Sequence, residues 1–139
     1  MSHEELIHAT YEAWREDDLD AWLETCDPEI EFRTSGTFPD LEPIYRGHEG
    51  MRDFWAAIRA PWEWFHLYVE RIVEGNDRAA VAIYFRARGQ ESGVKTELHQ
   101  GHAMHFRNRR VFKLSTHTSF EQALEVAGLQ EEAALPDSS

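Results

Sequence analysis

The segment ELHQGHAMHFRNRRVFKLSTHT, Glu97–Thr118, contains two runs of alternating side chains on either side of the polar turn Asn108–Arg110. Alternation with a period of two is typical of β-strands, and a short polar turn between two such runs predicts an antiparallel hairpin. Directly opposed residues of an antiparallel pair share a face of the sheet. A three-residue turn therefore predicts three inward-facing pairs: Phe106 with Phe112, Met104 with Leu114, and His102 with Thr116.

The same alternation predicts strands at Glu29–Thr34, Trp62–Glu74 and Arg78–Arg88. Turns at Gly75–Asp77 and Gly89–Gly93 separate the later strands, and no helical pattern interrupts the chain from there to the hairpin. The later strands therefore form an antiparallel meander. The residues predicted to point into one core or cavity are Ile30, Phe32, Val81, Ile83, Phe85, Met104, Phe106, Phe112 and Leu114.

Four helices are predicted from capping residues and from apolar side chains spaced three and four apart. Capping boxes at Ser2–Glu5 and Ser119–Gln122 start the first and the last helix, Asp17 or Asp18 starts a short second one, and the third covers Gly47–Ala60. Helices on one face of a sheet make an α+β fold. We expect a cone-shaped, curved antiparallel sheet with helices on its concave face, enclosing an apolar pocket.

The pocket mouth is predicted to lie under the loop from Ser35 to Arg46, which contains Gly36, Pro39 and Pro43. Residues 1–129 are predicted to form one domain, as expected for a chain of 139 residues, and the polar segment 130–139 is predicted to be a disordered tail.

Composition excludes several classes of partner. With 26 acidic and 14 basic residues, the net charge of −12 disfavours binding to nucleic acid or to an anionic membrane surface. No apolar run is long enough to span a bilayer, and the N-terminus lacks the features of a signal peptide, which indicates a cytoplasmic protein. The one cysteine, Cys26, continues an apolar helical pattern and is predicted to be buried. Twelve arginines against two lysines are typical of bacteria with high-GC genomes.

Short sequence motifs along nearly the whole chain resemble those of the SnoaL-like branch of the nuclear-transport-factor-2-like superfamily. The resemblance lies in Asp18–Trp22, Asp27–Phe32, Tyr45–Gly50, Phe106–Asn108, Glu121–Leu124 and Ala127–Leu129. It implies the cone fold and cofactor-independent chemistry. Relatives include ketosteroid isomerases, polyketide cyclases, limonene-type epoxide hydrolases, dehydratases and binding modules, so the fold alone does not choose among these functions.

The acidic residues of these enzymes have no counterpart here. The isomerase resemblance matches an aromatic hydroxyl at Tyr11, but it places Thr34 at the position of the general base and Met104 at that of the acid. The epoxide hydrolase and cyclase sites need inward acidic residues on strands, and every Asp of this sequence falls on a predicted helix, turn or tail. The known mechanisms of these relatives are therefore disfavoured.

Histidine remains as a group for proton transfer. His99, His102 and His105 are spaced by three along one strand, so they alternate between faces and cannot bind one metal ion together. Only His102 faces the pocket, where it is predicted to act as general acid or base with Tyr11 as a donor to an oxyanion. The alternative is a buried histidine bonded to Thr116 or to water.

The first hypothesis is an isomerase, cyclase or dehydratase acting on a small, polyketide-like, terpenoid or other carbonyl-bearing apolar molecule. The alternative is a non-catalytic ligand-binding or dimerisation module. Predicted ligand-binding residues are Trp14, Phe32, Thr34, Trp55, Phe85, Met104, Phe106 and Thr116. A homodimer is expected through an outer sheet face that bears Tyr84, Arg86, His105, Lys113 and His117.

Overall fold

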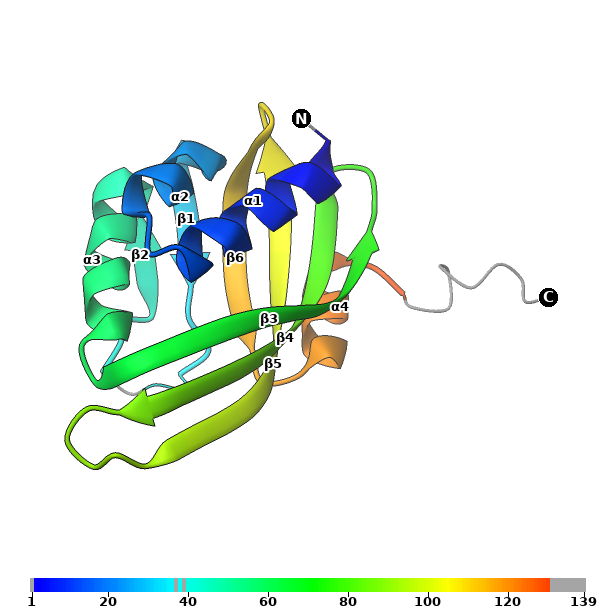
Figure 1. Cartoon of the computed structure of the whole chain (residues 1–139). Helices are drawn as coiled ribbons and strands as arrows, with labels where there is room; N and C mark the ends of the chain where they lie inside the picture. Colours follow the sequence, from blue (N-terminus) through cyan, green and yellow to red (C-terminus); the bar gives the residue numbers. More distant parts are fainter. Residues whose placement is uncertain (1, 37, 39, 131–139) are drawn as a thin grey trace.

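The computed structural model describes residues 2–36, 38 and 40–130, so most of the predicted tail, residues 131–139, lies outside the described residues. None of its helices is long and apolar enough to cross a membrane. The elements are α1 (His3–Arg15), α2 (Leu19–Thr25), β1 (Cys26–Arg33), β2 (Ile44–Arg46), α3 (Gly47–Arg59), β3 (Trp62–Glu74), β4 (Arg78–Gly89), β5 (Lys95–Arg107), β6 (Arg110–His117) and α4 (Phe120–Ala127) (Figure 1).

The strands form one sheet in the order β2-β1-β6-β5-β4-β3. Neighbours pair antiparallel except β1 and β6, which run parallel. The sheet is therefore mixed rather than wholly antiparallel, because β1 pairs with a strand that follows it only after α3 and the meander. Irregularities in the register of β3 and β6 are of the kind that bends strands, and they accompany the curvature visible in Figure 1.

The first three helices pack on the inner face of the sheet, as predicted (Figure 1). At the start of α1 the Ser2 hydroxyl accepts from the Glu5 backbone N–H and the Glu5 carboxylate accepts from the Ser2 backbone N–H, which confirms the capping box. The Asp18 side chain caps α2 by accepting from Ala21 N–H. These caps fix the start of two of the three helices that line the cavity described below.

The last helix, α4, lies on the opposite, outer face, where it packs on Val73, Ala80 and Ala103. The prediction that the helices all cover the concave face is thus wrong for α4. Its first turn approaches β5 so closely that a Cβ on Gly101 would lie 2.4 Å from the Ser119 carbonyl oxygen. Small residues on the outer face of β4 and β5 make this docking possible.

The β5–β6 hairpin differs from the predicted register near its turn. Only Asn108 and Arg109 form the turn, with φ of 54° and 62°, as in a type I′ hairpin. Phe106 therefore pairs with Val111, and the irregularity that follows leaves Phe112 without a partner. Phe112 does not enter the cavity as predicted; its ring lies 3.7 Å from the Arg107 guanidinium carbon.

Beyond this irregularity the predicted pairs of Met104 with Leu114 and His102 with Thr116 are confirmed. The other residues predicted to face inward are buried, and they are Ile30, Phe32, Val81, Ile83, Phe85, Met104, Phe106 and Leu114.

The connection after β1 is shorter than the predicted loop, because Ile44–Arg46 forms β2 and pairs with β1. The ends of the connection are joined by hydrogen bonds from Thr34 N–H to the Pro43 carbonyl and from the Thr34 hydroxyl to the Glu42 carbonyl. Thr37 and Pro39 lie outside the described residues. Phe38 packs against Phe85, with ring centroids 5.5 Å apart, so part of this connection does lie over the inner face.

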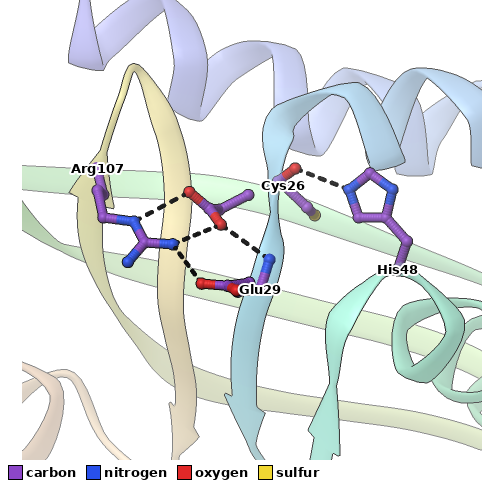
Figure 2. A network of polar contacts seen from close by, with 5 residues as sticks. Cys26, Glu29, His48 and Arg107 are labelled. Carbon is purple, nitrogen blue, oxygen red and sulfur yellow. Dashed lines mark hydrogen bonds and ion pairs between the residues drawn. The ribbon is translucent and has the colours of Figure 1, made fainter.

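A polar network holds the start of β1 against its neighbours (Figure 2). The Arg107 guanidinium donates to both carboxylate oxygens of buried Asp27, at 2.9 and 3.2 Å, and to Glu29 at 3.1 Å. His48, at the start of α3, donates from Nε2 to the Cys26 carbonyl at 2.9 Å. The Arg107 hydrogen bonds lower the pKa of Asp27. The network thus fixes β1, which supplies Phe32 to the cavity and is followed directly by Thr34, which also lines it.

Candidate functional site

A cavity of about 70 Å³ lies between the inner face of the sheet and helices α1 to α3. Its walls are mostly aromatic and aliphatic. Six of the eight predicted ligand-binding residues line it, and they are Trp14, Phe32, Thr34, Phe85, Met104 and Thr116. Both predicted catalytic residues, Tyr11 and His102, line it as well.

The other two predicted ligand-binding residues, Trp55 and Phe106, lie outside the cavity lining. Trp55 packs behind the wall, with its ring centroid 4.1 Å from that of Trp14 and 5.6 Å from that of Trp22. Phe106 lies near the start of α1 and stacks on His3 at 4.3 Å. Both face inward as their spacing indicates, but an inward side chain reaches the cavity only where the helices leave space above the sheet.

Tyr11 and His102 form a hydrogen-bonded pair in the cavity wall. The Tyr11 hydroxyl lies 2.6 Å from His102 Nδ1, and their rings stack with centroids 5.8 Å apart. Only 3% of Tyr11 and 7% of His102 are exposed. The residue bonded to His102 is thus Tyr11 of α1, whereas the alternative prediction named Thr116 or water.

Burial sets the protonation of both groups. Desolvation raises the pKa of Tyr11, so its phenol stays protonated. Desolvation, with a smaller contribution from His117, lowers the pKa of His102 to about 3. The pair is therefore neutral near pH 7.

The neutral pair has one tautomer that satisfies its hydrogen bonds. The Tyr11 hydroxyl has no other acceptor among the described residues, so its proton is donated to His102 Nδ1. A neutral imidazole that accepts at Nδ1 carries its proton on Nε2. Since Nε2 has no partner among the described residues, His102 presents an N–H donor at the cavity wall.

Two threonine side chains of the cavity wall donate hydrogen bonds to the backbone. The Thr10 hydroxyl donates to the Leu6 carbonyl at 3.0 Å, and the Thr34 hydroxyl to that of Glu42 at 2.6 Å. Gln100 is different, because its side-chain amide is buried in the cavity wall and makes no hydrogen bond within the described residues. It was not among the predicted site residues. Its position on β5, two residues before His102, is the signal that places it on the same face.

No carboxylate and no lysine or arginine lines the cavity within the described residues. The acidic residues of the related enzymes are therefore not supplied by another part of the described fold. The thiol of Cys26 is buried, and burial raises its pKa to about 12, as expected of a structural cysteine.

Comparison with known proteins identifies a matching family. The family profile described as a SnoaL-like domain matches residues 7–114. A search of curated protein sequences found no match.

Solved structures share the fold at low sequence identity. A nuclear-transport-factor-2-like protein of unknown function from Burkholderia pseudomallei is 21% identical, with a TM-score of 0.79 over 91% of this chain and 98% of that one. TerC, co-crystallised with polyporic acid, is 21% identical, with a TM-score of 0.76 over 89% of this chain and 96% of its own. A Catenulispora acidiphila protein with a ketosteroid isomerase-like fold, in complex with trimethylamine, is 13% identical, with a TM-score of 0.73 over 94% of this chain and 98% of that one.

Proposed function

We propose that this chain, which belongs to the SnoaL-like domain family, binds a small apolar, carbonyl-bearing molecule and catalyses its isomerisation, cyclisation or dehydration. The observation that carries the proposal is the buried Tyr11–His102 pair, 2.6 Å apart, in an otherwise apolar cavity. Polar groups of this kind are costly to bury, and they are often retained because they act on a ligand.

His102 acts in this proposal as a neutral acid rather than as a base. Its Nε2–H donates to the carbonyl oxygen of the ligand and stabilises negative charge that develops there, which is the role assigned to Tyr11 from the sequence. Tyr11 is a positioning residue, because its hydroxyl holds Nδ1 and thereby fixes the tautomer. Proton removal from carbon by His102 is disfavoured, since it would create an imidazolium in an apolar cavity.

The ligand must displace side chains to enter. Ordinary ligand pockets have volumes of about 300–1,000 Å³, several times the 70 Å³ of this cavity. Phe38 and Leu41 line the cavity from the connection between β1 and β2, outside any helix or strand. We therefore place the entry of the ligand beside these two side chains.

The test is His102→Leu, which removes both ring nitrogens, with His105→Leu as the matched control. His105 lies on the same strand but on the other face, opposite Arg78 and Lys113. A panel of cyclic diketones and hydroxyquinones is first screened for binding by thermal shift and then for turnover. We expect His102→Leu, which removes the N–H donor, to lower kcat about 10²-fold with a smaller effect on binding, and the control to keep full activity. Full turnover in His102→Leu would refute the mechanism.

The second candidate is a ligand-binding module without chemistry, and it is favoured by the lack of any carboxylate in the cavity lining of the described residues. In that case the panel still stabilises the protein. Every bound compound would then be recovered unchanged after prolonged incubation.

We further propose that the protein is a cytoplasmic homodimer. The predicted dimer face is divided by α4, which leaves Tyr84 and Arg86 on one side and His105 and Lys113 on the other. The Tyr84 side carries a row of aromatic rings, with Tyr84 6.0 Å from Tyr68 and 5.0 Å from His99. We assign the dimer to this side, because aromatic side chains favour interfaces.

Light scattering tests the assignment of the dimer. We expect twice the monomer mass of 16.2 kDa. Tyr68→Glu is expected to give the monomer, whereas Lys113→Glu, on the other side of α4, is expected to keep the dimer. A dimer that survives Tyr68→Glu and dissociates in Lys113→Glu would reverse the assignment.

A further inference from the structure

The hydroxyl proton of Thr116 has no acceptor among the residues that the structure describes. The Ser35 backbone N–H donates to Thr116 Oγ1 at 3.0 Å, so the oxygen already accepts one hydrogen bond. No acceptor for the Thr116 proton occurs among the described residues. The hydroxyl is therefore a donor available to a ligand at the cavity wall, which Thr116 lines.

This donor lies next to the one on His102. Thr116 and His102 are directly opposed in the β5–β6 pair and point to the same face. Opposed side chains have Cβ atoms about 4.5–5.5 Å apart, which lets a hydroxyl and an imidazole N–H reach the same atom. Both residues line the cavity, and no carboxylate stands beside them in the lining that the structure describes.

We propose that the Thr116 hydroxyl and His102 Nε2–H together bind one negatively charged oxygen, so that the cavity selects conjugated enols and phenols as their enolates or phenolates. The inference rests on the proposed function, because it assumes that the cavity binds a ligand. Thr116 is the specificity-determining residue: it adds a second donor without adding a charge. Two hydrogen bonds to an anion favour the charged form over the neutral one.

The direction in which the ionisation midpoint of a bound phenol shifts distinguishes the site from a plain apolar pocket. An apolar wall disfavours an anion, and so does a net charge of −12 on the protein. Without the two donors, a phenol would therefore bind as the neutral molecule and its ionisation would shift to higher pH. A shift to lower pH requires donors that converge on the oxygen.

The experiment titrates 4-nitrophenol, which absorbs visible light strongly only as the phenolate, with and without saturating protein. We expect the ionisation midpoint of the bound probe to lie below that of the free probe. Thr116→Val, which keeps the shape and removes the hydroxyl, is expected to weaken phenolate binding about tenfold or more and to move the midpoint upward. Thr116→Ser is expected to restore both, and Thr118→Val, whose hydroxyl bonds Gln122 outside the cavity, to change neither.

Two results would overturn the inference. One is a midpoint that rises on binding to the wild-type protein, and the other is a lowered midpoint that Thr116→Val leaves unchanged. Either would leave ligand binding intact, and the second would also leave the role of His102 intact. Failure of both 4-nitrophenol and nitrobenzene to bind would instead count against the proposed function and would remove the basis of the inference with it.

Discussion

Replacing Tyr11 by Phe isolates the hydrogen bond that defines the site. The variant keeps the ring that stacks on His102 and removes only the hydroxyl, whose oxygen lies 2.6 Å from Nδ1. Nδ1 then has no donor among the described residues, in a side chain that is 7% exposed. An unpaired buried polar group costs about 1–3 kcal/mol. The phenol hydroxyl no longer has to be desolvated, so we expect the lower part of this range, about 1–2 kcal/mol.

Urea unfolding followed by tryptophan fluorescence measures this loss. With a slope of about 2 kcal/mol per M, the midpoint of Tyr11→Phe should fall by about 0.5–1 M at pH 7. Val126→Ala on α4 is the control, because Val126 is exposed and its truncation should change stability by less than about 0.5 kcal/mol.

A double-mutant cycle with His102→Leu supplies the outcome that would refute the reasoning. When His102 is absent, the Tyr11 hydroxyl has no partner within the described residues, so its removal should cost little or should stabilise the protein. If Tyr11→Phe lowers the midpoint equally in both backgrounds, the hydrogen bond does not contribute as argued. The tautomer assignment would then lose its basis.

Two further predictions concern pH and the network at β1. The pKa of His102 falls from 6.5 to about 3 on folding. Between these two values only the unfolded chain binds a proton at His102, so the free energy of unfolding should fall by up to about 1.4 kcal/mol per pH unit as the pH is lowered. His102→Leu should reduce that slope, and an unchanged slope would contradict the burial argument. Asp27→Asn should lower the free energy of unfolding by about 1 kcal/mol at pH 7, since Arg107 is partly exposed. Because the pKa of Asp27 is lowered in the folded state, the difference should vanish in urea titrations well below pH 3.8, and a constant difference would show that charge is not its cause.

Local sequence patterns predicted most elements of this fold. Alternation identified β3 to β6, and caps at Ser2 and Asp18 located the helices correctly, because both signals depend on neighbours in the sequence. The side of the sheet that α4 covers was not predictable in the same way. The choice depends on whether the outer face can accept a helix, and the residues that allow it, Ala80, Gly101 and Ala103, come from two strands.

The turn of the β5–β6 hairpin shows a different limit. Asn108–Arg110 is recognisable as a turn, but its length decides which residues oppose each other. A two-residue turn followed by an irregularity restores the predicted register at His105 and beyond, so that only Phe112 is displaced. His102, Met104 and Thr116 therefore line the cavity although the turn beside them was predicted one residue too long.

The candidate site depends on a contact that no local pattern contains. Tyr11 and His102 lie 91 residues apart in sequence, and each was predicted to face the cavity and act on a ligand. Their direct hydrogen bond changes that assignment, because a hydroxyl that donates to Nδ1 is no longer free to bind an oxyanion. By fixing the proton on Nε2, the bond makes His102 the donor. In the proposed function, His102 thus polarises a carbonyl without any charged residue in the described lining.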